Sequence, residues 1–445
     1  MRRTNILLYS VGFAAVSLLI TPLSGAEDGD GSGLLTLEEA LSLADKQNLL
    51  LQEVRQERES AEGRVIAARS AALPHLNLRG QYLRQDDVAT FDFGGAPFEM
   101  GRKNNYEVAL EARQVIFAGG GILAGVRQAG LSGDAVNSQI EYSRSQIAYQ
   151  VHALFNGVLL AKENLAVTSQ AVELARQNSH DVQARFDQGM ATKFDLLRAQ
   201  EQITRTEAEQ IAAKNTVRTR RIELLKVLQL PLTDPRRIED EFLFQPVAPD
   251  EKIAMTAALQ NRQDLEKTRY EVEAEKEGVV VANSDWFPKV ALFGQYRYGD
   301  PTREFEDEWE TSWLAGVRLE FSVFDGLLTA GKTRQQDARL RQSQLRAQNL
   351  EDMIRLEVTR AIFDLETAGE VVEARRKNRI QAEESLRLAQ LGYEEGIEQQ
   401  LDVLDAQLTF TRSRQVYALA VYQYIMAGVE LDRAMGVLLN GAPTS

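Results

Sequence analysis

Two very long stretches without proline constrain the fold of this chain more than any other feature of its sequence. They span residues 98–230 and 302–442, and each follows a short region that contains two prolines. Proline removes a backbone hydrogen bond and its ring clashes inside a helix, so long helices must avoid it. Each stretch can therefore hold helices much longer than those of an ordinary globular domain.

The two halves of the chain also match at particular positions. The matched positions are Leu73-Pro74 with Phe287-Pro288, Phe117-Ala118-Gly119 with Phe324-Asp325-Gly326, residues 186–200 with 393–407, and Asn48 with Asn261. The offset stays between 207 and 214 residues, which predicts an internal duplication. We expect a first repeat at 27–230, a connector with four prolines at 231–251, and a second repeat at 252–445.

Inside the first long stretch, apolar and small residues recur at spacings that alternate between four and three. They are Ile147, Val151, Leu154, Val158, Ala161, Leu165, Thr168, Val172, Ala175, Ser179, Val182 and Phe186. This period of 3.5 residues is typical of helices that pack knobs into holes. The second stretch keeps the spacing from Phe410 to Leu438, with Arg414 and Gly428 as exceptions. A helix over residues 122–185 would be roughly 95 Å long at 1.5 Å per residue.

Four shorter runs alternate instead with a period of two, which is typical of strands. Their apolar faces hold Leu76, Leu78 and Tyr82; Tyr106, Val108 and Leu110; Val290, Leu292, Tyr296 and Tyr298; and Trp313, Val317, Leu319 and Phe321. The other faces are mostly polar, as in a membrane barrel with lipid outside and a lumen inside. A half-buried soluble sheet shows the same alternation and is the alternative. Trp309 and Trp313, as possible interface anchors, favour the barrel, as do polar loops at about 86–104 and 299–311.

Four strands are too few to close a barrel in lipid, because the smallest such barrels have eight. Open sheet edges are excluded there, since unpaired backbone groups find no water. If these strands span a membrane, several chains must share one barrel. The number of chains does not follow from the sequence.

The first residues have the features of a secretion signal. Arg2 and Arg3 precede an apolar segment at residues 6–20, and small residues precede an expected cleavage site after Ala26. We therefore expect a signal peptide at residues 1–26 and no transmembrane helix after it. The chain has no cysteine, so neither disulfides nor a lipid anchor are expected. Its formal charge of −14 argues against binding to nucleic acid.

The order of these parts resembles the TolC family of outer membrane efflux proteins, and the resemblance covers nearly all of the chain after the signal. Residues 37–48 look like the opening helix of that family. Leu73-Pro74 and Phe287-Pro288 look like its entries into the barrel, and Phe117 and Phe324 with their glycines look like the exits. Residues 189–200 and 396–407 look like its two periplasmic turns.

The resemblance implies a mainly α fold with a transmembrane β-barrel. Four β-strands per chain would contribute to a shared trimeric barrel, and the duplicated helices to a long periplasmic α-helical coiled-coil barrel. It implies the outer-membrane exit duct of a tripartite efflux pump or of a type I secretion system, which conducts passively and has neither a cofactor nor enzymatic activity. Its expected partners are two further copies, outer-membrane lipid, a periplasmic adaptor protein and an inner-membrane transporter of the RND or ABC type.

By the same resemblance, the turns hold the candidate channel constriction. Asp402 and Asp405 are three residues apart, so they share one face of a helix. In a symmetric trimer they would form rings of carboxylates that favour cations. The alternative is a solvated acidic helix start, which the helix dipole also favours.

Asp195, near Lys193, holds the matching position in the first repeat. In the family this turn helps to lock the entrance shut, and a basic residue commonly follows the second glycine by two positions. This chain has Glu398 there, so the usual salt bridge is in doubt, and Lys193, Arg185 or Arg198 are the candidate replacements.

Gly189 and Gly396 are expected to take the left-handed backbone that ends one helix and starts the next. Met190 and Ile397, beside them, are the expected apolar contacts for an adaptor.

Other classes of protein have less support. A periplasmic coiled-coil adaptor or spacer is the main alternative, and it would have no membrane-spanning strands. Gly119-Gly120-Gly121 lacks the lysine of a phosphate-binding loop. His75, His152 and His180 are scattered, which predicts no metal site, and no grouping of serine, histidine and acid suggests catalysis.

Overall fold

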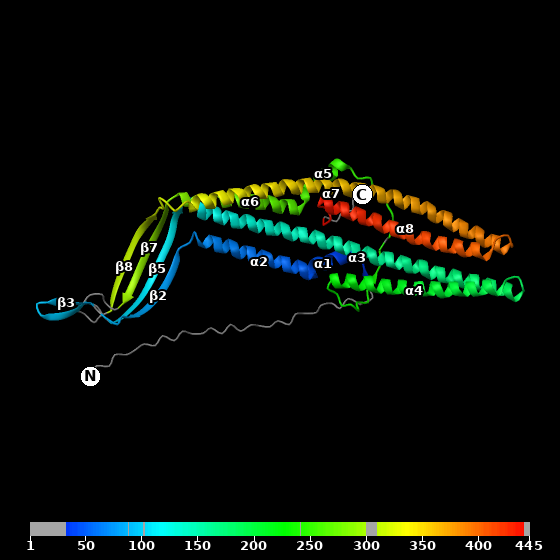
Figure 1. Ribbon diagram of the computed structural model, residues 1–445, viewed down its shortest axis with the longest axis horizontal. Helices are drawn as coiled ribbons and strands as arrows, with labels where there is room; N and C mark the ends of the chain where they lie inside the picture. The colour runs from blue at the N-terminus through cyan, green and yellow to red at the C-terminus, as the bar shows by residue number, and fades with distance from the viewer. Residues whose placement is uncertain (1–32, 88, 101–102, 241, 300–308, 440–445) are drawn as a thin grey trace, which may run out of the picture.

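The computed structural model describes residues 33–87, 89–100, 103–240, 242–299 and 309–439. The expected signal peptide at residues 1–26 lies outside the described residues, as does most of the loop expected at 299–311. Figure 1 shows an elongated molecule with a sheet at one end. Long helices run away from the sheet and end in two tight turns at the opposite end.

The same six elements occur twice along the chain. The first half has α1 (Leu37–Gln47), α2 (Leu49–Ser70), β2 (His75–Arg84), β5 (Asn104–Ala118), α3 (Gly121–Asp187) and α4 (Lys193–Val227). The second half has α5 (Glu251–Asn261), α6 (Gln263–Asn283), β7 (Lys289–Gly299), β8 (Glu310–Glu320), α7 (Leu328–Glu394) and α8 (Gln400–Met435). Helices α3 and α7 have 67 residues each, roughly 100 Å, which confirms the long helices predicted from the proline-free stretches.

A few short elements were not predicted. Strand β1 (Leu34–Leu35) pairs in parallel with β6 (Arg237–Ile238) and so ties the start of the first half to the connector. Strands β3 (Ala89–Phe93) and β4 (Ala96–Met100) form a hairpin beyond the sheet (Figure 1). The expectation of a plain polar loop at 86–104 was therefore wrong. A short 3-10 turn, η1 (Ser284–Trp286), precedes β7.

The four predicted strands form one antiparallel sheet in the order β2-β5-β7-β8. Its register sets Leu78 opposite Leu110, Leu110 opposite Tyr296, and Tyr296 opposite Trp313. Because opposed residues point to the same face, the four apolar runs make one continuous apolar surface. Both β2 and β8 have a free edge within the described part of the chain.

The helices follow the same lateral order as the strands. Near the sheet, α2 packs on α3, α3 on α6, and α6 on α7. Farther away, α4 packs on α3, α3 on α8, and α8 on α7. The chain is thus a one-layer wall with β2, α2 and α4 at one edge and β8 and α7 at the other (Figure 1). No helix in the described ranges is long and apolar enough to cross a membrane.

Each half has its own apolar core near the middle of the molecule. The first core includes Leu51, Phe155, Leu224 and Ile238; the second includes Leu265, Ile354, Val421 and Leu431. Several residues that recur at the predicted 3.5-residue spacing are buried, among them Val151, Val158, Val172 and Val182. Arg414, an exception to that pattern, reaches from α8 to Glu163 on α3 at 3.3 Å. A charged residue is therefore accommodated where two helical hairpins meet.

The corners between the short helices correct one predicted correspondence. Asn48 ends α1 and caps α2 by accepting hydrogen bonds from the backbone N–H groups of Leu50 and Leu51. The residue with the same two roles in the second half is Arg262, because α5 ends at Asn261 and α6 begins at Gln263. The match of Asn48 with Asn261 was thus wrong by one position.

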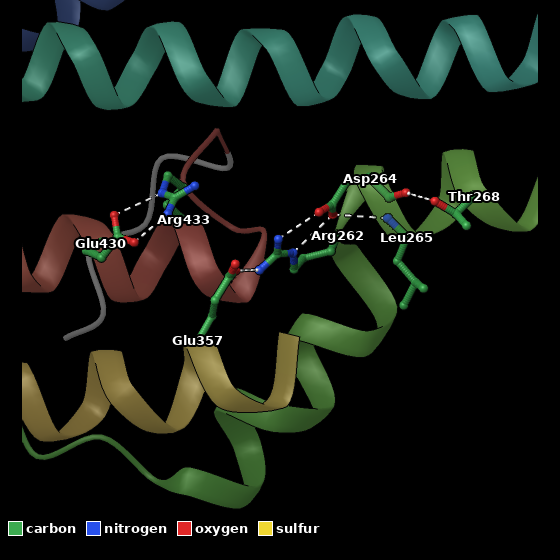
Figure 2. A network of polar contacts seen from close by, with 7 residues as sticks. All are labelled: Arg262, Asp264, Leu265, Thr268, Glu357, Glu430 and Arg433. Atoms are coloured by element: carbon green, nitrogen blue, oxygen red, sulfur yellow. Dashed lines mark hydrogen bonds and ion pairs between the residues drawn. The ribbon is translucent and has the colours of Figure 1, made fainter. Parts of the chain in front are cut away.

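Arg262 stabilises this corner through ion pairs, whereas Asn48 stabilises its corner through an amide that caps the helix. Its guanidinium bonds both oxygens of Asp264, at 3.0 and 2.7 Å, and also bonds Glu357 on α7 (Figure 2). Burial disfavours the charged guanidinium, but the hydrogen bonds that it donates to the two carboxylates outweigh this effect and raise the pKa of Arg262. Figure 2 shows a second pair, Arg433 with Glu430, beside it on α8.

Candidate functional site

Two nearly identical turns form the end of the molecule that lies farthest from the sheet. Gly189 joins α3 to α4 with φ +77°, and Gly396 joins α7 to α8 with φ +76°. The backbone N–H of Met190 donates a hydrogen bond to the carbonyl of Arg185 at 2.8 Å, and the backbone N–H of Ile397 donates one to the carbonyl of Gly392 at 2.8 Å. The left-handed backbone predicted at both glycines is therefore present, and it ends the long helix in each half.

Met190 and Ile397 follow these glycines and are held out from the turns. Their side chains are 68% and 75% exposed. Side chains this apolar and this exposed on adjacent turns offer a contact surface at the tip. Their use by an adaptor stays a prediction.

The two candidate acids that begin helices have a local structural role. The carboxylate of Asp195 accepts a hydrogen bond from the backbone N–H of Thr192 at 3.0 Å. The carboxylate of Asp402 accepts one from the backbone N–H of Gln399 at 2.9 Å. Both acids close capping boxes at the starts of α4 and α8. Asp402 thus has the capping role that was the alternative to a constriction, and the two roles are compatible.

Asp405 and Lys193 are exposed at the same end of the chain. Within the described ranges, neither residue makes an ion pair, so the single chain does not contain the salt bridge considered for Lys193. Arg198 lies over the ring of Phe194, 5.8 Å from its centroid. The charges of Asp405 and Lys193 are thus open to solvent in the single chain.

The link that joins the two turns runs through Arg185. Its guanidinium lies 4.1 Å from the centre of the Tyr393 ring and donates to the Tyr393 carbonyl at 2.8 Å. Gln400 adds a hydrogen bond to the Asp195 carbonyl at 3.1 Å. Burial raises the pKa of Tyr393, although Arg185 opposes this effect. The sequence offered Arg185 as a partner for an acid, whereas here it binds an aromatic ring and carbonyl oxygens.

At the opposite end, the polar face of the sheet carries paired charges. Arg79 lies 3.3 Å from Glu111, and Arg297 lies 3.7 Å from Glu107. Gln295 donates to Glu111 at 3.3 Å. Opposite charges joined across strands suit a surface in contact with water, so this face fits the wall of an aqueous lumen.

Aromatic side chains gather at the end of the sheet that lies away from the helices. Tyr82 stacks on Tyr106 with ring centres 4.9 Å apart, and Tyr298 lies 5.0 Å from Trp309. The other end of the sheet has exposed Trp286, Phe287 and Phe321. An apolar band flanked by two aromatic zones is the pattern of a membrane barrel wall. Of the two predicted interface anchors, Trp309 therefore lies at an end of the sheet, whereas Trp313 lies within β8, opposite Tyr296.

Comparisons with known proteins agree with this geometry. The family model described as outer membrane efflux protein matches residues 40–228 and 254–437. The chain is similar to the alkaline protease secretion protein AprF of Pseudomonas aeruginosa, at 24% identity over 92% of this chain and 88% of the relative. It is similar to the outer membrane protein TolC of Vibrio cholerae, at 24% identity over 90% of this chain and 91% of that one.

A solved structure has the same fold. The outer membrane protein VceC of Vibrio cholerae superposes with a TM-score of 0.78 at 16% identity, over 90% of this chain and 96% of that one. The family model spans both halves of the chain, including each of the two turns. The chain therefore belongs to the outer membrane efflux protein family, and it is an outer-membrane channel with a long periplasmic helical extension.

Proposed function

We propose that three copies of this chain form one exit duct. The observation that carries this proposal is the sheet, which has an apolar face, a charge-paired face and two free edges. Its four strands alternate in direction, so β8 of one copy would lie antiparallel to β2 of the next. Ring closure would remove every open edge, as a lipid environment requires. The wall of helices would continue the same ring into the periplasm.

The duct would conduct passively and carry out no catalytic step. Substrates would enter at the tip from an inner-membrane transporter of the RND or ABC type, through a periplasmic adaptor, and leave through the barrel. Residues 27–230 and 252–445 would act as two repeats of one wall, with 231–251 as their connector. The two separate apolar cores support this division.

Cysteine crosslinking tests the tip assignment, because the chain has no cysteine of its own. We expect Met190→Cys and Ile397→Cys to capture the periplasmic adaptor in living cells, identified by mass spectrometry. The matched control is Ile66→Cys on α2, because Ile66 is 68% exposed, as is Met190, but lies near the sheet. Capture at Ile66 alone, or at neither turn while the protein is in the outer membrane, contradicts the assignment.

The constriction hypothesis predicts a change in ion selectivity. The double variant Asp402→Asn/Asp405→Asn is expected to lose the cation preference of the reconstituted channel, because two carboxylates per copy disappear from the entrance. The reversal potential in a salt gradient measures this preference. Asparagine also caps helices, so folding should persist. The control Glu366→Gln/Glu370→Gln removes two exposed acids of α7 near the middle of that helix, far from the tip; equal effects of both pairs would contradict the hypothesis.

A further inference from the structure

An open hollow of about 690 Å³ lies where the helices meet the base of the sheet. Small residues of α2, α3 and α6 form its floor, among them Ala68, Gly121 and Gly278. Its charged lining residues are Asp285, Lys289, Lys332 and Arg339. Three elements, η1, β7 and α7, therefore bring these charged side chains to one side of the chain.

This hollow lies on the same side as the polar face of the sheet. Side chains alternate along a strand, so Lys289 points with Gln295 and Arg297. Gln295 bonds Glu111, which in turn pairs with Arg79, so all of them lie on the charge-paired face. The hollow therefore extends the charge-paired face of the sheet onto the helices, on the side that would face the lumen.

Two further cations lie on this face at the base of the sheet. Arg113 is two residues from Glu111 on β5 and so shares its face. Arg318 lies opposite Ala291, which shares the face of Gln295 because the two residues are four apart on β7. The guanidinium of Arg318 lies 5.1 Å from the centre of the Phe293 ring. We call Arg113, Lys289, Arg318, Lys332 and Arg339 the basal cation belt. All five side chains are exposed.

The belt carries an excess of positive charge. The carboxylates at this level are Asp285, Glu320, Asp325 and Glu275, which accepts a hydrogen bond from Gln336 in the lining of the hollow. Asp285 bridges Lys289 at 2.8 Å and Lys332 at 3.0 Å, and Asp325 caps α7 through Thr329 at 2.8 Å. Five cations against four carboxylates leave a net charge of +1 per chain. In the described ranges, Arg113, Arg318 and Arg339 have no carboxylate partner, whereas Arg79 and Arg297 higher on the sheet are paired.

We propose that the basal cation belt is an anion-binding ring inside the duct, which holds multivalent oxyanions such as phosphorylated or polycarboxylated solutes. This inference rests on the proposed trimeric duct, in which three belts would face one lumen. Guanidinium and ammonium groups bind such oxyanions through charge-assisted hydrogen bonds. The acidic entrance and this ring would then select opposite charges at the two ends of one passage.

Pyrophosphate block of the full-length channel in planar bilayers tests the ring. Pyrophosphate added on the barrel side is expected to reduce the single-channel current of the unchanged protein. In Lys332→Gln/Arg339→Gln the concentration for half block should rise about tenfold, because two cations per copy are lost. Low salt is needed, since about 0.1 M salt screens charges beyond roughly 10 Å. In a second measurement, pyrophosphate is added on the tip side. Comparing the block from the two sides shows whether the ring binds solutes that leave through the duct or solutes that enter from outside.

The matched control is Arg127→Gln/Lys276→Gln. These cations lie at a similar height on α3 and α6, and neither lines the hollow. Block by pyrophosphate should be unchanged there and in Lys332→Arg/Arg339→Lys. If the Gln double variant does not insert, Arg339→Gln alone should raise the half-block concentration about threefold. A conducting channel whose block is absent, or equal in all variants, overturns the ring; a protein that conducts no current overturns the duct itself.

Discussion

Replacing Arg262 by alanine is expected to lower the free energy of unfolding by about 3 kcal/mol per chain, because the change leaves two carboxylates without their partner in a mostly buried corner. The Arg262 side chain is only 7% exposed and joins α6 to α7 through Asp264 and Glu357 (Figure 2). Urea unfolding at one fixed protein concentration measures the loss, since the stability of an oligomer depends on concentration.

Two variants show whether the loss comes from this network. Arg269→Ala removes an exposed arginine of α6 that pairs with Glu266 at 3.4 Å and donates to the Leu259 carbonyl at 3.3 Å, and it should change stability by less than about 1 kcal/mol. Arg262→Lys keeps the charge but not the fork that bonds two carboxylates, so an intermediate loss is expected. Equal stability of Arg262→Ala and Arg269→Ala would contradict the assigned role of the corner.

Gly119→Ala is expected to destabilise the junction between sheet and helices by about 3 kcal/mol, the sum of left-handed strain and overpacking. Gly119 has φ +58°, and an added Cβ would lie 2.7 Å from the Ser284 carbonyl oxygen and 2.8 Å from the Phe287 Cβ. Neither neighbour can move freely, because both belong to the turn that starts β7. The amount of folded protein in the outer membrane and its urea midpoint measure the effect.

Gly120 supplies the control for this prediction. It has φ +82°, but nothing lies within 4 Å of an added Cβ. Gly120→Ala should therefore show the strain alone, about 1 kcal/mol. An equal effect at both positions would show that the contact with Ser284 and Phe287 adds nothing.

Gly326, the counterpart of Gly119 in the second half, extends the test to assembly. It has φ +69° and open space around it in the single chain. In a closed ring, the start of β2 in the next copy would take the place that Phe287 has beside Gly119. Gly326→Ala should then cost about 3 kcal/mol in the assembled protein; a cost of about 1 kcal/mol would mean that no copy packs there.

Much of the fold followed from local patterns. Proline positions gave the long helices, alternation gave the four strands, and two glycines gave the turns with their positive φ angles. The duplication was visible because matched motifs recur at a nearly constant offset. The predicted match of Asn48 was wrong by one residue. An asparagine caps the helix at this corner in the first half, whereas the ion pairs of Arg262 hold the corner in the second half.

The candidate site was predicted in its positions but not in its contacts. Met190 and Ile397 are exposed on the turns as expected, whereas Asp402 begins a helix, which was the alternative to a constriction, and so does Asp195. The stacking of Arg185 on Tyr393 had no signal in the sequence, because the two residues come from different halves. Cation–π contacts leave no spacing pattern that periodicity could detect.

The sequence by itself determined the long helices, the four strands of the sheet and the two glycine turns, and it indicated to which family the chain belongs. These properties depend on neighbours within a few residues, or on motifs repeated along the chain. Only the tertiary structure decided the lateral order of the wall, its free edges, and the gathering of Arg113, Lys289, Arg318, Lys332 and Arg339 on one surface. Such contacts join residues up to hundreds of positions apart, so packing between elements decides them.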